Sequence, residues 1–194
     1  MTLKSSVLTY LLIFSVLICF GQTTTKKTYT KAQLAEFEAN YKIKKKKDKA
    51  ARKDLNNTIL TELSLQDITG TTHTLESLKG KVVVMNFWFI NCKPCVAEIP
   101  DLNELKSKFK EQPVVFFAVA LDNKSALEKF LEHTRFDFTI IPRGGSLAKR
   151  FKIPHYPYNV ILDQNGQLEY VSDVLSLNIM NRLKRRINGL LKRN

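Results

Sequence analysis

Two cysteines separated by two residues are the strongest candidates for chemistry in this chain. Cys92 and Cys95 stand in the segment NFWFINCKPCVAEIP, after an apolar run and before residues that favour a helix. Such a pair can exchange disulfides, supply half of a zinc site, or form a structural staple. A staple across so short a loop removes little chain entropy from the unfolded state, so stabilisation is a poor reason for it.

A zinc site and a redox pair make different demands on the rest of the sequence. Zinc needs further ligands, usually a second CxxC or a histidine pair, and the histidines show no paired spacing: His73, His133 and His155. A cysteine at the start of a helix instead lies beside unpaired backbone N–H groups, which favour its thiolate. Lys93 adds a positive charge, and Pro94 suits a first helical turn. We therefore predict a redox pair that needs no metal and no other cofactor.

The predicted elements around the pair alternate between strand and helix. Strand–helix–strand alternation predicts parallel pairing in a central sheet, and a final hairpin predicts an antiparallel edge. The expected order begins with two short strands about a turn at Thr69–Gly70, a helical turn before Gly80, a buried strand at 81–89 and a helix from Cys92 to about Phe109. A buried strand at 113–121, a helix at 125–133 capped by Ser125 and a short strand at 138–141 follow. The last elements are a helix at 146–153, a hairpin at 158–171 and a basic amphipathic helix at 177–191.

Five segments carry a family resemblance: GKVVVMNFW, CKPC, EIP, VVFFAVALD and FKIPHYPYNVILDQNG. With them the chain resembles the thioredoxin superfamily, and more narrowly the exported thiol–disulfide oxidoreductases of the TlpA/ResA type. The likeness extends from residue 57 to about residue 192. It implies an α/β, thioredoxin-like fold in which helices flank a central mixed β-sheet, with an N-terminal β-hairpin extension.

The resemblance also assigns roles at the site. It implies that Cys92 attacks, that Cys95 is the buried resolving cysteine, and that the two form a redox disulfide. Pro157 would be a cis-proline beside that disulfide, and it would expose the backbone of Tyr156 to an extended substrate segment. Pro154 is the alternative position for the cis-proline.

Several neighbouring residues match or depart from the family pattern. Glu98, three residues after Cys95, either helps proton handling near the cysteines or is an ordinary exposed glutamate. Pro100 matches a proline that kinks the helix. Asn86 stands where thioredoxins have a buried, proton-accepting aspartate, so this chain must work without that group. His155, in a position often held by glycine, is either a structural loop residue or a group that tunes the cysteines.

The N-terminus indicates the compartment. Lys4 precedes an apolar run from Val7 to Phe20, which is short for a membrane span and suits the core of a signal peptide. We predict cleavage after Gly21, with an uncleaved membrane anchor and a lipoprotein signal at Cys19 as alternatives. The expected organisation is a signal peptide at 1–21, a basic linker or arm at 22–56 and a thioredoxin-like domain at 57–194, exported to the periplasm or cell envelope.

The formal charge of +13 is concentrated in two extensions. Residues 22–56 hold 11 basic and 4 acidic residues, and residues 174–194 hold six basic and no acidic ones. Such segments either solvate the protein or contact an anionic membrane surface. Export argues against nucleic acid as their partner.

The expected function is thiol–disulfide exchange outside the cytoplasm, in the direction of reduction. The substrates would be exported proteins that contain disulfides, with apocytochrome c among the candidates, and a membrane thiol donor would re-reduce the pair. One alternative is a peroxide-reducing redoxin, although FWFINCKPC lacks the Pro-x-x-x-Thr-x-x-Cys setting of a peroxidatic cysteine. The other alternative is a non-catalytic thioredoxin-like binding module at the cell envelope.

Overall fold

The computed structural model describes residues 63–171 and 178–193. The predicted signal peptide, the cysteine at position 19 and the basic arm lie outside the described residues. None of the helices in the described part of the chain has the length and hydrophobicity that a membrane crossing requires.

The described elements follow the predicted order. The strands are β1 (Ser64–Gln66), β2 (Thr72–Thr74), β3 (Val82–Trp88), β4 (Val114–Ala120), β5 (Thr139–Ile141), β6 (Tyr158–Leu162) and β7 (Leu168–Val171). The helices are α3 (Leu75–Leu78), α4 (Lys93–Ala97), α5 (Ile99–Ser107), α6 (Lys124–Leu131), α7 (Gly145–Arg150) and α8 (Ile179–Leu191).

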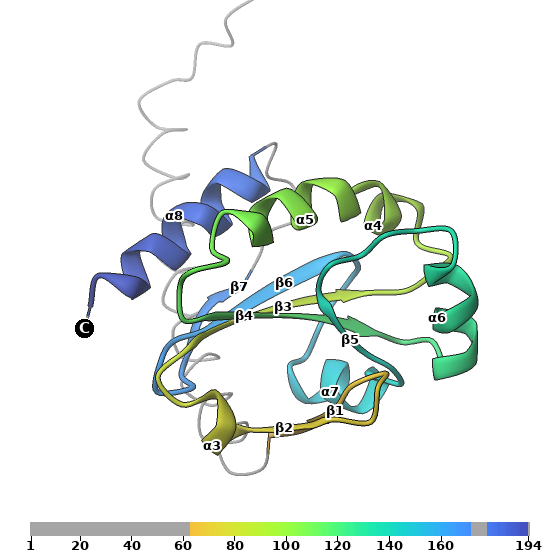
Figure 1. Ribbon diagram of the computed structural model, residues 1–194, viewed down its shortest axis with the longest axis horizontal. Helices are drawn as coiled ribbons and strands as arrows, with labels where there is room; N and C mark the ends of the chain where they lie inside the picture. The colour runs from red at the N-terminus through yellow and green to blue at the C-terminus, as the bar shows by residue number, and fades with distance from the viewer. Residues whose placement is uncertain (1–62, 172–177, 194) are drawn as a thin grey trace, which may run out of the picture. The chain divides into compact units, whose positions relative to one another are not determined.

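A mixed sheet with the strand order β5-β4-β3-β6-β7 forms the centre of the fold. Strands β3 and β4 pair in parallel, as do β4 and β5, whereas β6 runs antiparallel to both β3 and β7. Strands β1 and β2 form a separate antiparallel hairpin. Helices α4, α5 and α8 cover one face of the sheet, and α7 lies with the hairpin on the other (Figure 1). This arrangement confirms the predicted thioredoxin-like α/β fold with its N-terminal hairpin.

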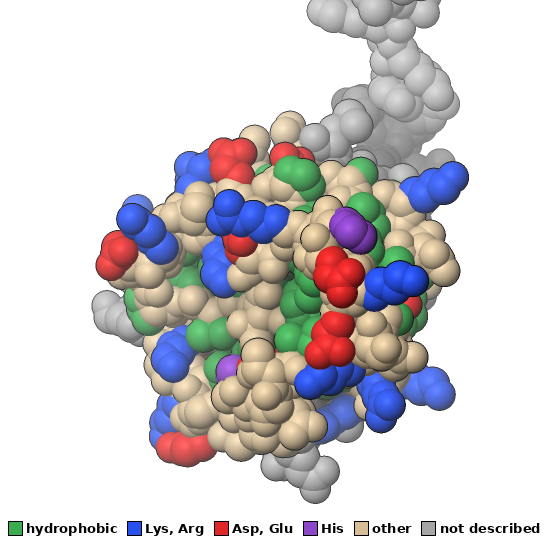
Figure 2. All heavy atoms as spheres, turned by 45° about the vertical axis from the view of Figure 1, so that its right-hand side comes forward, with side chains coloured by type: hydrophobic (Ala, Val, Ile, Leu, Met, Phe, Trp, Pro, Cys, Tyr) green, Lys and Arg blue, Asp and Glu red, His purple; other side chains and the backbone are tan. Residues whose placement is uncertain are grey.

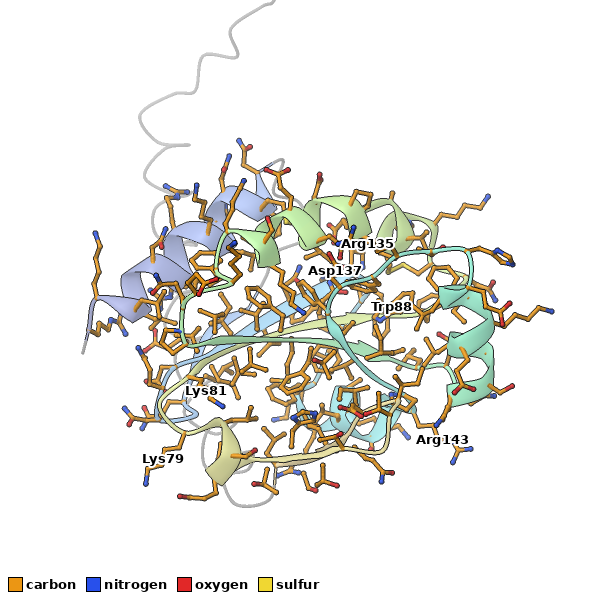
Figure 3. The ribbon with its side chains drawn as sticks, viewed as in Figure 1. Lys79, Lys81, Trp88, Arg135, Asp137 and Arg143 are labelled. Atoms are coloured by element: carbon orange, nitrogen blue, oxygen red, sulfur yellow. A yellow bond between two sulfur atoms is a disulfide. The ribbon has the colours of Figure 1, made fainter. Side chains whose placement is uncertain are left out.

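Alternation along β3 divides the core into two layers, because successive side chains of a strand point to opposite faces. Val82, Val84 and Trp88 pack with apolar residues of α4, α5 and α8. Val83 and Met85 point the other way, toward the hairpin and α7. Both faces are therefore buried, which explains why the strand reads as a continuous apolar run. Side chains fill the space on both sides of the sheet (Figure 3).

The boundaries of two helices differ from the prediction. The helix expected from Cys92 to Phe109 is divided at Glu98 into α4 and α5. Pro100, in the first turn of α5, has no N–H to donate across this junction, so one continuous helix would lack a hydrogen bond there. The prediction that Ser125 caps α6 was wrong. Asn123 is the cap, and its Oδ1 accepts a hydrogen bond from the N–H of Ala126 at 2.9 Å.

The C-terminal helix is amphipathic, but part of its charge is already paired. Arg186 and Arg193 both donate to the carboxylate of Glu169 on β7, and Lys184 attracts an acidic side chain of α5. These pairings leave a smaller basic face than the composition suggested. Among the described residues, no ion pair is found for three exposed cations of α8 and its C-terminal end: Arg182, Arg185 and Lys192.

Charges on the remainder of the domain are mixed in sign. Figure 2 shows the face turned toward α6, where basic and acidic side chains are interspersed and apolar side chains are visible between them. This pattern agrees with the near balance of basic and acidic residues between the two basic extensions.

Gly144 occupies a position that has no room for a side chain. A Cβ there would lie 2.3 Å from Cγ1 of Val119 and 3.1 Å from the carbonyl oxygen of Ala120, which accepts the Gly144 N–H at 2.7 Å. We expect Gly144→Ala to lower the free energy of unfolding by about 2 kcal/mol, because Val119 is buried and stiff. Urea denaturation measures the change. Gly145→Ala is the matched control, since a Cβ at Gly145 meets nothing within 4 Å, and equal stability of the two variants would contradict this packing argument.

Candidate redox site

Cys92 and Cys95 form a disulfide at the start of α4, with their Cα atoms 5.2 Å apart. Cys92 is the N-cap of the helix, and its side chain is 6% exposed. Cys95, one turn further, is 1% exposed. Both cysteines are buried, Cys92 slightly less than Cys95, and their attacking and resolving roles stay predictions.

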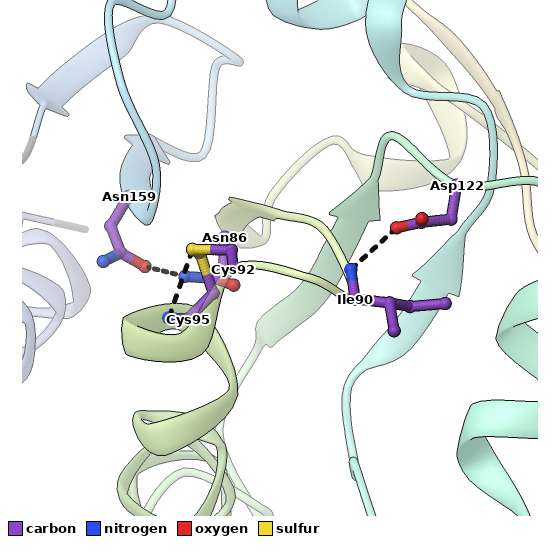
Figure 4. Close-up of a disulfide and its surroundings, with 6 residues drawn as sticks. All are labelled: Asn86, Ile90, Cys92, Cys95, Asp122 and Asn159. Carbon is purple, nitrogen blue, oxygen red and sulfur yellow. Dashed lines mark hydrogen bonds between the residues drawn. A yellow bond between two sulfur atoms is a disulfide. The ribbon is translucent and has the colours of Figure 1, made fainter.

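One backbone N–H of the first helical turn contacts the Cys92 sulfur. The N–H of Cys95 donates to its Sγ at 3.3 Å (Figure 4). The N–H of Cys92 closes a turn with the carbonyl of Phe89 at 3.1 Å. In the reduced protein such N–H groups at a helix start stabilise a thiolate. Lys93 and Pro94 are exposed in the same turn, and their supporting roles stay predictions.

A pair of asparagines lies beneath the disulfide. Asn86 is 1% exposed on β3, and its Nδ2 donates to Oδ1 of Asn159 at 3.0 Å (Figure 4). The two residues face each other in the β3–β6 register. A neutral amide pair therefore occupies the position where thioredoxins carry a buried aspartate. Sequence reasoning singled out Asn86 but missed Asn159, because the strand pairing joins residues 73 positions apart.

The loop before β6 supports the site from another side. The peptide bond between Tyr156 and Pro157 is cis, which confirms Pro157 over Pro154 as the cis-proline. The Tyr156 ring packs edge-to-face on Phe89, with centroids 5.5 Å apart. Tyr156 also packs against the apolar cluster that contains both cysteines, and its burial raises the pKa of its hydroxyl. The ring of His155 packs on Tyr158 instead.

Glu98 is half-buried at the junction between α4 and α5, one turn beyond Cys95. Desolvation, with a smaller contribution from the nearby charge of Asp101, raises the pKa of Glu98 to about 7. Its Oε2 is buried and has no hydrogen-bond partner within the described ranges. A carboxyl with this pKa holds and releases a proton near neutral pH, which is the property that a proton-handling group needs. The structure therefore argues against the reading of Glu98 as an ordinary exposed glutamate.

Trp88 ends β3 just before the cysteine loop, and it is completely buried. Its ring packs on Phe130 and Phe136, with both centroids at 5.4 Å, in the apolar layer that also holds the cysteines (Figure 3). The indole N–H finds no acceptor in the part of the chain that the structure describes. Trp88 thus forms an apolar wall of the site, and packing accounts for its presence.

Asp122 is a neighbour of the site that sequence reasoning did not find. It follows β4, and its Oδ2 accepts the backbone N–H of Ile90 at 2.9 Å (Figure 4). Because β3 and β4 are parallel, their carboxyl ends meet at one edge of the sheet, where sites on such sheets commonly form. A polar residue directly after a second buried strand was the available signal.

The zinc alternative gains no further ligand from the structure. Within residues 63–171 and 178–193, no group of three or more His, Cys, Asp or Glu side chains is arranged to hold a metal ion. The two sulfurs are bonded to each other. The geometry fits disulfide exchange, in which one sulfur forms and breaks bonds with a partner and the second displaces that partner.

The fold and the CxxC disulfide at the start of a helix define this chain as a thioredoxin-like protein with a redox-type cysteine pair. A family model described as the AhpC/TSA family matches residues 57–171. The chain therefore belongs to the AhpC/TSA family. The segment before Cys92 nevertheless lacks the proline and threonine of a peroxidatic site.

Similar proteins include thiol–disulfide oxidoreductases. The protein named thiol-disulfide oxidoreductase ResA from Geobacillus kaustophilus is 35% identical over 109 residues, covering 55% of this chain and 63% of that relative, or less than two thirds of its length. The protein of the same name from Bacillus anthracis is 31% identical over 129 residues, covering 66% of this chain and 71% of that relative. A crystal structure from Chlorobium tepidum, described as a thiol:disulfide interchange protein DsbE, matches with a TM-score of 0.61 and 25% identity, covering 68% of this chain and 94% of its own.

Proposed function

We propose that this protein is a thiol–disulfide oxidoreductase that exchanges disulfides with protein substrates through Cys92 and Cys95. The observation that carries the proposal is the disulfide between a slightly exposed cysteine at the N-cap of α4 and a fully buried cysteine one turn later. The named activity of the ResA relatives supports the same class of reaction.

In the proposed reaction the dithiol form reduces its substrate. The Cys92 thiolate attacks one sulfur of a substrate disulfide, forms a mixed disulfide, and expels the other substrate sulfur as a thiolate that takes up a proton. The Cys95 thiolate then attacks Sγ of Cys92 and releases the second substrate thiol. Two electrons pass to the substrate, and the Cys92–Cys95 disulfide remains. We propose that Glu98, whose pKa of about 7 allows both protonation states near neutral pH, takes the proton that Cys95 loses.

The proposal extends to compartment, direction and partners. The apolar N-terminal run supports export to the periplasm or cell envelope, and the TlpA/ResA resemblance supports reduction of exported proteins, including apocytochrome c, with re-reduction by a membrane thiol donor. The exposed cations Arg182, Arg185 and Lys192 of the C-terminal helix, together with the basic arm, would add a weak electrostatic contact with an anionic membrane surface.

Two measurements on the full chain test the proposal. The reduced protein should cleave the disulfides of insulin faster than an equal concentration of dithiothreitol, and its midpoint potential should lie below about −200 mV, as for a reductant. A potential near about −120 mV would reverse the direction. Failure to cleave insulin would contradict the proposed reaction class. Consumption of hydrogen peroxide that depends on the cysteines would favour the redoxin alternative.

A further inference from the structure

The loop between β3 and α4 connects the sheet to the attacking cysteine, and it contains only a few residues. Its path is fixed by a turn in which the N–H of Cys92 donates to the carbonyl of Phe89. The Phe89 ring rests on Tyr156 of the cis-proline loop. A second contact holds the loop at Ile90, whose N–H donates to the Asp122 carboxylate. Figure 4 shows this bond and the disulfide at two ends of one loop.

Asp122 is itself held firmly by backbone contacts. The N–H of the preceding Leu121 donates to the carbonyl of Trp88 at 3.1 Å, which extends the β3–β4 pairing to the start of the loop. The carbonyl of Asp122 accepts the N–H of Arg143 at 2.8 Å. The next residue, Gly144, is bound to Ala120 in a position where a Cβ would clash. The carboxylate that meets Ile90 therefore projects from a backbone with little freedom to move.

From these contacts we propose that Asp122 is a positioning residue for the attacking cysteine, a role that rests on the proposed disulfide exchange. Its carboxylate fixes the Ile90 amide, and this bond sets the direction in which the chain enters α4. The entry direction determines whether the N–H of Cys95, 3.3 Å away, points at the Cys92 sulfur. Asp122 acts through a hydrogen bond to the loop, so an uncharged acceptor of the same shape should replace it.

The test compares full-length wild type with Asp122→Ala, which removes the acceptor, and Asp122→Asn, which keeps one. Asp163→Ala is the matched control. Asp163 also follows a strand and accepts two backbone N–H groups, from Asn165 at 2.9 Å and Gln167 at 2.8 Å, but at the opposite end of the sheet. The readouts are the rate at which each reduced protein cleaves dithiobis(nitrobenzoate) and the equilibrium constant of each disulfide with glutathione.

We expect Asp122→Ala to react about tenfold more slowly, because the nucleophile is no longer held in place. Its thiolate loses stabilisation, so the equilibrium constant should shift about tenfold toward the disulfide, or about 30 mV to more negative potential. Asp122→Asn should lie within about twofold of wild type in both measurements. Asp163→Ala should match wild type in both, which separates loss of a loop acceptor near the site from loss of one elsewhere.

Three results would overturn the positioning role. The first is a folded Asp122→Ala variant whose cleavage rate and glutathione equilibrium match those of the wild type. The second is an Asp122→Asn variant as impaired as Asp122→Ala, because that result would assign the effect to the charge of Asp122. If Asp122→Ala does not fold, hydrogen exchange of the Ile90 amide in the wild type decides: protection of about a hundredfold is expected, and exchange at the unfolded rate contradicts the bond. Wild type that fails to reduce insulin but equilibrates with glutathione would defeat the proposed action on protein substrates, while the glutathione equilibrium would still test Asp122.

Discussion

Cys92→Ser is expected to abolish disulfide exchange, lowering the rate of insulin reduction by about a thousandfold or more, because a serine hydroxyl cannot form a disulfide. Cys95→Ser should behave differently. With the buried resolving sulfur removed, the mixed disulfide on Cys92 has no internal thiol to displace the substrate. Partner proteins should therefore accumulate in covalent, reducible complexes with the Cys95→Ser variant, visible on non-reducing gels of envelope fractions.

The two variants together separate catalysis from binding. Cys92→Ser is the control for trapping, since it should yield no adducts although Cys95 remains. Adducts that form on Cys92→Ser, or none on Cys95→Ser, would contradict the assignment of attacking and resolving roles. Full biological activity of Cys92→Ser would instead support a non-catalytic binding module.

Glu98→Gln is expected to stabilise the folded protein at pH 8, by about 1 to 2 kcal/mol after allowing for the partial exposure of the carboxyl. The pKa of Glu98 is about 7 in the folded protein, against an ordinary value of 4.5. Between these pH values the unfolded chain releases this proton while the folded protein retains it. The contribution of Glu98 to stability therefore falls as the pH rises from about 4.5 to about 7, and it remains low above that.

Urea denaturation at pH 4.5, 6 and 8 measures this dependence. The advantage of Glu98→Gln should be small at pH 4.5, where the carboxyl is neutral in the folded protein and only half ionised in the unfolded chain, and largest at pH 8. Glu111→Gln, at an exposed position after α5, is the control and should show no comparable trend. An advantage that is largest at pH 4.5, or absent at pH 8, would contradict a desolvated carboxyl at this position.

The local elements of the fold were predictable because their causes are local. Continuous apolar runs gave β3 and β4 with both faces buried, and a turn sequence after β6 gave the antiparallel hairpin. The junction at Glu98 was only partly predictable. Pro100 indicated a kink, but not that the chain would divide at Glu98 into two helices. The cap of α6 was misassigned because Asn123 and Ser125 are both good N-cap residues at neighbouring positions.

By itself the sequence determined the chemistry: two cysteines one helical turn apart, directly after a buried strand, with a proline-containing segment before β6. Only the tertiary structure decided the surroundings of that chemistry. The Asn86–Asn159 pair joins residues 73 positions apart, and the Ile90–Asp122 bond joins residues 32 positions apart. Strand order and register, which no local pattern specifies, bring these groups together. The same packing desolvates Glu98, and a carboxyl's pKa depends on the solvent it loses more than on its neighbours in sequence.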